Sequence, residues 1–111
     1  MRGGFERRKG SLVFHFTGQL DAYSEKQFKS YVEDVLEANN LSVVIDLSNI
    51  DFIDSSGLGA LVQAAKQCNE RKRSFLLVGN ARVIQTIKLV RLEEFLHLSP
   101  DLSTALSQLA A

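Results

Sequence analysis

The segment LSVVIDL, residues 41–47, restricts the possible folds of this chain more than any other feature. It is a near-continuous apolar run, typical of a strand that is buried on both faces of a parallel sheet. A sheet with one face in water shows alternating polar residues instead. The run therefore predicts a layered α/β fold around a mostly parallel sheet.

Other segments also have the composition of strands, because β-branched and aromatic residues are concentrated in them. These strand patterns are residues 11–17, which end at Gly18, residues 74–79, and the short segment 95–98. Residues 4–9 are expected to pair with residues 11–17 as the edge strand of a hairpin. The prediction is a sheet of four to five strands.

Four helical patterns alternate with these strands, and in each of them apolar residues recur at three- and four-residue spacing. They are the stretch that Ser24 opens and Asn39-Asn40 ends, the stretch from Leu58, residues 82–90, and residues 101–110 after Pro100. The alternation predicts a single α/β domain over residues 1–111, with its core at about 11–98 and a terminal helix at about 101–110.

The first helix has recognisable start and stop signals. Ser24 is expected to be its N-cap, and Gln27 stands where it completes a capping box. Asn39 and Asn40 are expected to end it, because asparagine tolerates the left-handed conformation that a helix end often needs.

Charge and hydropathy exclude several classes of protein. Lys plus Arg and Asp plus Glu both number 13, so the net charge is zero and no basic surface for nucleic acid is expected. Basic clusters at residues 7–9 and 71–73 lie beside predicted turns and are interpreted as solvated loop charge. No secretory signal, membrane span or disulfide is expected, which predicts a cytoplasmic protein with one unpaired cysteine, Cys68, late in a helix.

The stretch Asp54-Ser55-Ser56-Gly57 separates an apolar segment from the helix that follows it. It therefore occupies the carboxyl end of a strand, where functional groups gather in open parallel sheets. One interpretation is structural: Asp54 or Ser55 caps the helix, and Gly57 eases a tight entry. A nucleophile elbow is excluded, because Asp54 and Ile53 stand where that motif needs glycine.

The residues give little support to other catalytic hypotheses. The two histidines, His15 and His97, each fall within a short apolar strand pattern and are interpreted as wall or surface residues of the sheet. Gly57 and Gly59 lack the spacing and the lysine of a phosphate-binding loop. We therefore expect no enzymatic activity, no cofactor and no bound metal.

A serine hydroxyl at a helix amino terminus is well placed for regulation by phosphorylation. Free amide hydrogens and the helix dipole favour anionic charge there. Phosphorylating Ser55 adds about −1.5 to −2 charges, although Asp54 opposes them locally. The modification is expected to change what the surface binds rather than to unfold the domain.

Residues 43–67, VVIDLSNIDFIDSSGLGALVQAAKQ, with FTGQLDAYS at 16–24 upstream, resemble the STAS domain family. Within it they are similar to the stand-alone bacterial anti-sigma factor antagonists, and the element order extends the resemblance over residues 77–98. The resemblance implies a phosphorylation-controlled partner switch. The unmodified antagonist binds an anti-sigma factor that is also a serine kinase, which frees a sigma factor for transcription. Phosphorylation of the serine after the motif's aspartate, here Ser55, releases the kinase, and a metal-dependent PP2C-type phosphatase reverses it.

The expected partner-binding residues surround this serine: Asp21, Asp54, Ser56, Gly57 and Gly59. Asp21 falls on the family's position near the serine, and an equally good interpretation makes it a turn acid before the first helix. Ser56 is an alternative phosphate acceptor. Arg91 stands where family members often carry glycine, which leaves the end of the third helix in question.

Two alternatives from other classes remain open. The protein is a constitutive STAS scaffold subunit of a signalling or lipid-transport assembly if Ser55 is never modified. It is a nucleotide-binding or nucleotide-hydrolysing protein if the surface around Asp21 and Ser55 holds a nucleotide.

Overall fold

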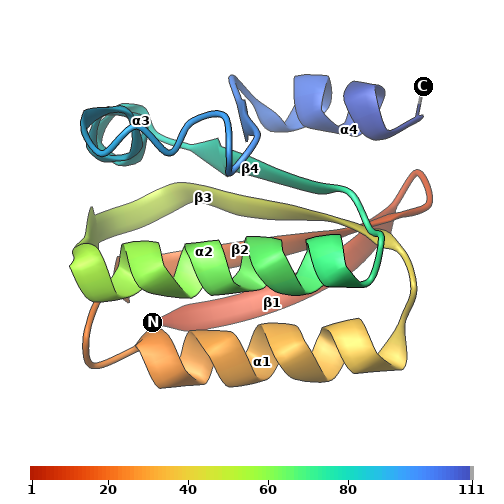
Figure 1. Cartoon of the computed structure of the whole chain (residues 1–111), viewed down its shortest axis with the longest axis horizontal. Helices are drawn as coiled ribbons and strands as arrows, with labels where there is room; N and C mark the ends of the chain where they lie inside the picture. Colours follow the sequence, from red (N-terminus) through yellow and green to blue (C-terminus); the bar gives the residue numbers. More distant parts are fainter. Residues whose placement is uncertain (111) are drawn as a thin grey trace.

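The computed structural model describes residues 1–110 as a five-stranded sheet packed between helices (Figure 1). The strands are β1 (Arg2–Arg8), β2 (Ser11–Leu20), β3 (Ser42–Ile53), β4 (Phe75–Gly79) and β5 (Leu98–Ser99). The helices are α1 (Glu25–Ala38), α2 (Ser55–Glu70), α3 (Ala81–Leu89) and α4 (Leu102–Ala110). The strands lie in chain order; β1 runs antiparallel to β2, and all other neighbours are parallel. The predicted α/β class and the hairpin at the sheet edge are confirmed.

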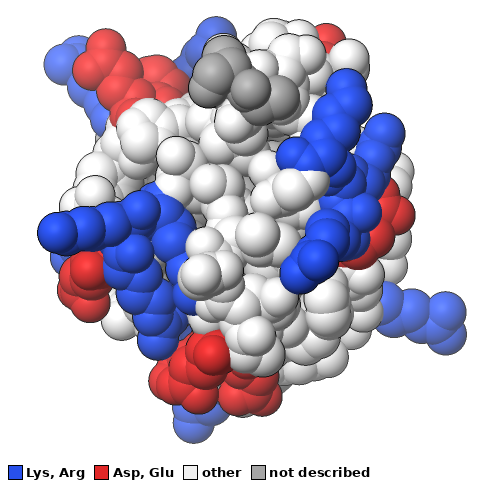
Figure 2. Space-filling model, turned by 90° about the vertical axis from the view of Figure 1, so that its right-hand side faces the viewer, with Lys and Arg blue, Asp and Glu red and all other residues white. Residues whose placement is uncertain are grey.

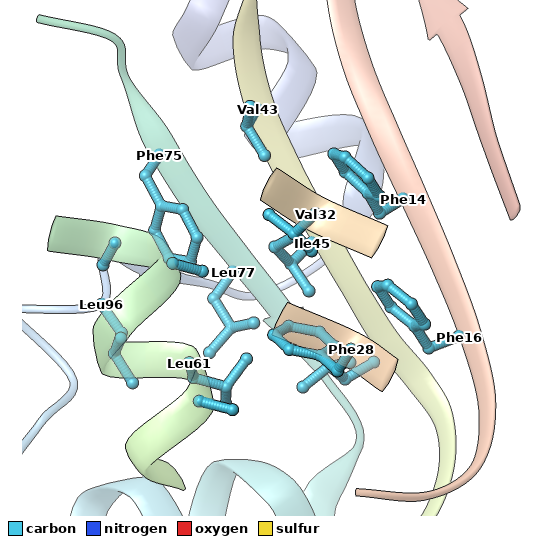
Figure 3. Packing of buried hydrophobic residues seen from close by; sticks show 14 of the residues in the cluster. Phe14, Phe16, Phe28, Val32, Val43, Ile45, Leu61, Phe75, Leu77 and Leu96 are labelled. Atoms are coloured by element: carbon cyan, nitrogen blue, oxygen red, sulfur yellow. The ribbon is translucent and has the colours of Figure 1, made fainter. Parts of the chain in front are cut away.

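Both faces of the sheet are covered, as the apolar run at residues 41–47 predicted. Helices α1 and α2 lie on one side of the sheet and α4 on the other (Figure 1). Strand β3 has both of its faces buried: Val43 and Ile45 belong to the main core, and Val44 belongs to a smaller cluster under α4. Figure 3 shows the main core, where strand residues meet helix residues: Phe14, Phe16, Ile45 and Leu77 against Phe28, Val32 and Leu61.

Several element boundaries differ from the sequence prediction. Strands β2 and β3 continue to Leu20 and Ile53, and α2 begins at Ser55, three residues before Leu58. The pairing of β2 with β3 shifts register twice, between His15 and Thr17 and again after Gly18, which disrupts the simple alternation of side chains. The expected strand at 95–98 was misplaced, since β5 is only Leu98–Ser99 and the residues before it form turns.

The predicted capping box at the start of α1 was wrong. The Ser24 side chain makes no cap hydrogen bond. Its hydroxyl donates instead to the carbonyl of Gln19 at 2.7 Å, and the Gln27 amide lies 3.5 Å from the carbonyl oxygen of Met1. Ser24 therefore ties the loop before α1 to the end of β2.

Helix α1 ends where the sequence predicted, but the conformation and hydrogen bonds that end it are different. Asn39 is extended, with φ −140°, not left-handed, and its side-chain amide donates to the carbonyl of Val35 at 3.1 Å. Arg73 donates to the carbonyl oxygens of Leu36 and Asn39. A cation at a helix C-terminus is favourable, so at least this member of the 71–73 cluster supports the fold.

Arg91 closes α3 in the left-handed conformation. Its φ is +59°, and its N–H donates to the carbonyl of Lys88 at 3.1 Å. A side chain in this conformation costs roughly 1 kcal/mol that glycine avoids. We therefore expect Arg91→Gly to raise the free energy of unfolding by about 0.5–1 kcal/mol in urea denaturation. Lys88→Gly, inside the helix, is the control and is expected to lower the free energy of unfolding by about 1 kcal/mol. If both variants lowered the free energy of unfolding, the proposed strain at Arg91 would be contradicted.

Cys68 lies in α2 and is completely buried. Burial raises the pKa of its thiol from 9.0 to about 11, despite the nearby charges of Arg73 and Arg71. Only the thiolate reacts, so we expect native protein to be alkylated by iodoacetamide at least about tenfold more slowly than unfolded protein at the same mildly alkaline pH.

The same shift predicts how stability changes with pH. The unfolded thiol ionises near 9.0 and the native thiol near 11, so the folded state prefers the neutral form. The contribution of Cys68 to the free energy of unfolding is therefore complete below pH 9.0 and is lost as the pH rises towards 11.

In the alkylation experiment, equal rates for native and unfolded protein would show that the Cys68 thiol is accessible.

Within residues 1–110, no helix is both long and apolar enough to cross a lipid bilayer.

Candidate functional site

The amino terminus of α2 is held by Asp54, which is the N-cap. Its Oδ1 accepts the N–H of Gly57 at 3.0 Å, and its carbonyl accepts the N–H of Leu58 at 2.9 Å. Its own N–H donates to the carbonyl of Leu20 at 3.3 Å. Of the two capping candidates, Asp54 therefore takes the role, and Ser55 becomes the first residue of the helix.

The two serines of the motif differ in exposure. Ser55 is exposed at the first position of α2, whereas Ser56 is only partly exposed one residue further on. Ser55 is therefore the more accessible of the two serines. The first turn contains no acidic residue, although the N-cap itself carries the carboxylate of Asp54.

Asp21 lies beside this helix start because two loops are joined there. Its Oδ1 accepts the N–H groups of Tyr23 and Ser24 at 3.0 and 3.2 Å, so it is a turn acid before α1. The N–H of Ala22 donates to Oδ2 of Asp54 at 3.3 Å. The structure thus brings Asp21, Asp54 and Ser55 to one edge of the sheet, at the carboxyl ends of β2 and β3.

The two glycines of the motif have different environments. A Cβ atom on Gly57 would lie 2.2 Å from the carbonyl oxygen of Leu20 and 2.9 Å from Cγ1 of Ile53. Gly57 is buried, and its missing side chain lets α2 pack against the end of β2. Gly59 is exposed, and a Cβ there would meet nothing within 4 Å. Gly57 is thus required for packing, whereas Gly59 is an exposed position without a side chain.

The basic clusters lie at the opposite end of the molecule. Residues 7–9 lie at the end of β1 and in the turn that leads to β2, and residues 71–73 lie in the loop before β4. Both clusters are near the amino ends of the parallel strands. Figure 2 views this end and shows Lys and Arg in separate groups with acidic residues close to them. Residues 7–9, 71 and 72 are exposed, as expected for solvated charge. That interpretation was wrong for Arg73, which is partly buried and donates to the end of α1. Neither cluster contributes to the Ser55 site.

Neither histidine is positioned as a base for the serines. His15 Nδ1 lies 2.9 Å from Oδ2 of Asp46, in the middle of the sheet. His97 lies in a turn rather than in the expected strand, with φ +50°, and its Nδ1 donates to the carbonyl of Phe75 at 2.9 Å. Residues 1–110 also contain no group of three or more potential ligand side chains that could hold a metal ion.

Sequence reasoning did not single out two aromatic residues that flank the site. Tyr23 is 98% exposed, and Phe52, near the end of β3, is 46% exposed. Both lie inside the segments that carry the STAS resemblance, at 16–24 and 43–67, but no pattern in the sequence marks their side chains as exposed.

The comparisons with known proteins agree with this geometry. The model of the STAS domain family matches residues 5–105, so the chain belongs to the STAS domain family. Among solved structures, an anti-sigma factor antagonist from Mycobacterium paratuberculosis superposes with a TM-score of 0.89 at 23% identity. That superposition covers 99% of this chain and 94% of the other, and it establishes the common fold.

Two curated relatives have similar sequences. The anti-sigma-B factor antagonist of Listeria monocytogenes is 26% identical over 94 residues, covering 84% of this chain and 82% of its own. The anti-sigma F factor antagonist of Paenibacillus polymyxa is 27% identical over 67 residues, covering 60% of this chain and 57% of its own. Both relatives are named as regulators that oppose an anti-sigma factor.

Proposed function

We propose that this protein is an anti-sigma factor antagonist that acts as a phosphorylation-controlled partner switch, with Ser55 as the phosphate acceptor. The observation that carries the proposal is the exposed Ser55 hydroxyl at the first position of α2, next to its cap Asp54. Membership of the STAS family and the names of the relatives support the antagonist role. The protein acts by binding, in the cytoplasm, and needs no cofactor.

The helix start accommodates the modified serine. The Asp54 carboxylate already accepts the N–H groups of Gly57 and Ala22, which fixes the loop and the helix independently of Ser55. A phosphate on Ser55 adds its charge at the positive end of the α2 dipole, and Asp54 opposes it in part. The fold therefore persists in both states, and the change acts on the surface.

The unmodified form binds an anti-sigma factor that is also a serine kinase. Asp21, Asp54 and Ser56 border the contact, and Gly59 permits close approach because no side chain rises from its position. Gly57 contributes indirectly by allowing α2 to sit against β2. Phosphorylation releases the kinase, and a PP2C-type phosphatase restores the binding form.

The proposal is tested by affinity capture from native lysate with Ser55→Ala and Ser55→Asp as baits. The alanine form is expected to retain a small ATP-binding kinase that the aspartate form loses. Ser56→Asp is the matched control and is expected to retain more of the kinase, since Ser56 is less exposed. If all baits retain the same proteins, the constitutive scaffold becomes the better interpretation.

A further inference from the structure

Large exposed apolar side chains in this protein fall into two regions away from the β1 edge. Tyr23 and Phe52 flank the Ser55 site, with exposures of 98% and 46%. The second region consists of Leu89 at the end of α3, Val90 and Phe95, and Phe95 has an exposure of 45%, nearly identical to that of Phe52. Away from the β1 edge, Phe52 and Phe95 therefore form a matched pair of exposed phenylalanines, of which only Phe52 lies by the candidate switch.

Tyr23 is held in place although its side chain is free. Its N–H donates to Oδ1 of Asp21 at 3.0 Å, and the preceding residue, Ala22, donates to Asp54. Through these bonds the Cα of Tyr23 lies within roughly 12 Å of the Cα of Asp54, given standard bond lengths. The backbone beneath Tyr23 is therefore fixed relative to Ser55.

Phe52 reaches the same surface from β3. It pairs in register with Gln19 of β2. It precedes Ser55 by three positions in the chain, so the Cα atoms of Phe52 and Ser55 lie within about 11 Å. A surface hollow of about 420 Å³ is lined by Tyr23, Gln19 and Asp51. Gln19 is the strand partner of Phe52 and Asp51 is its chain neighbour, so Phe52 lies beside this hollow. A standard interface of about 800 Å² per partner has a radius of about 16 Å, so one centred on Ser55 covers both aromatic residues.

We propose that the anti-sigma factor binds this protein mainly through Tyr23 and Phe52, which act as aromatic anchor residues. They flank Ser55, so phosphorylation of Ser55 acts within the same interface. This inference rests on the function proposed above. Interface energy is concentrated in a few residues, with tyrosine strongly enriched among them. A tyrosine on a fixed backbone loses little conformational entropy when it is buried by a partner, because it has only two side-chain torsions. The occupant is accordingly a protein with apolar pockets on either side of the serine.

The test uses the kinase recovered with the Ser55→Ala bait, identified by mass spectrometry and purified. Tyr23→Ser and Phe52→Ser are each expected to weaken its binding about 30-fold or more, whereas Phe95→Ser changes binding less than about twofold. Melting temperatures of the three variants are compared, so that a loss of binding through unfolding is recognised.

A second measurement keeps the side chains large. The chain has no tryptophan, so Tyr23→Trp, Phe52→Trp and Phe95→Trp each carry a single indole fluorophore. The first two are expected to shift their emission to shorter wavelength when the kinase is added, because the indole leaves water. The Phe95→Trp emission is expected to stay unchanged, with kinase plus wild-type chain as the blank.

The outcomes separate this inference from the function on which it rests. If Ser55→Asp loses the kinase while Tyr23→Ser and Phe52→Ser bind like wild type, the anchor role of Tyr23 and Phe52 is wrong. The phosphorylation-controlled partner switch is then still supported. Equal weakening by Phe95→Ser would also overturn the anchors. If the unmodified protein captures no kinase, or Ser55→Asp binds as tightly as wild type, the switch fails and the anchors fail with it.

Discussion

Replacing Ser55 by aspartate is expected to weaken binding of the anti-sigma factor by about 10²–10³-fold. A like charge of the partner within ~4 Å of the new carboxylate costs about 4 kcal/mol at an effective dielectric of 20, which corresponds to that loss. The melting temperature is expected to stay close to wild type, because a carboxylate at a helix start is favourable and Asp54 still caps α2.

The control for this variant is Ser55→Asn, which has nearly the same shape as Ser55→Asp but no charge. It is expected to bind within about tenfold of wild type, and titration calorimetry with the purified partner measures all three forms. If asparagine and aspartate weaken binding equally, the effect is steric. A large drop in melting temperature for Ser55→Asp would show that the substitution acts through the fold rather than at the interface.

Gly57→Ala is expected to have the largest effect on stability. Its Cβ would lie 2.2 Å from the carbonyl oxygen of Leu20, and a backbone atom has little freedom to yield. Forcing a methyl group into a close-packed site costs about 3 kcal/mol or more at such a contact. In a domain of this size the melting temperature falls by about 10 °C or more, which differential scanning calorimetry measures.

Gly59→Ala is the matched control, two residues further along the same helix. Nothing lies within 4 Å of its Cβ, and alanine favours a helix over glycine by about 1 kcal/mol. This variant is expected to be more stable than wild type. If both substitutions had the same effect, the close approach of α2 to β2 would not be what requires glycine at position 57.

The fold class was predictable because its signals are strong and local. The apolar run at 41–47 has one structural solution, a strand with both faces covered, and the α4 pattern after Pro100 matched the helix that covers the second face. Helix caps were less predictable, since Asp54 and Ser55 were equally good candidates for the same position. Only the contact of Asp54 Oδ1 with Gly57 N–H identifies the cap.

The remaining details depend on hydrogen bonds and side-chain exposure that arise only in the folded chain. Ser24 fits a capping box by spacing, but its hydroxyl is taken by the carbonyl of Gln19 across the turn. Asp21 is a turn acid and also lies at the Ser55 site, because Ala22 bonds to Asp54, 32 residues away. Aromatic exposure at Tyr23 is likewise a property of the folded surface, which no local pattern reports.

The central claim is that Ser55 carries the phosphate that controls the partner. The most direct measurement is tandem mass spectrometry of the protein after incubation with ATP and the kinase captured by the Ser55→Ala bait. One phosphate group on Ser55, absent from the Ser55→Ala protein and removed by a PP2C-type phosphatase, is the result that this account predicts. A phosphate on Ser56, or an unmodified chain that still releases the kinase, would contradict it.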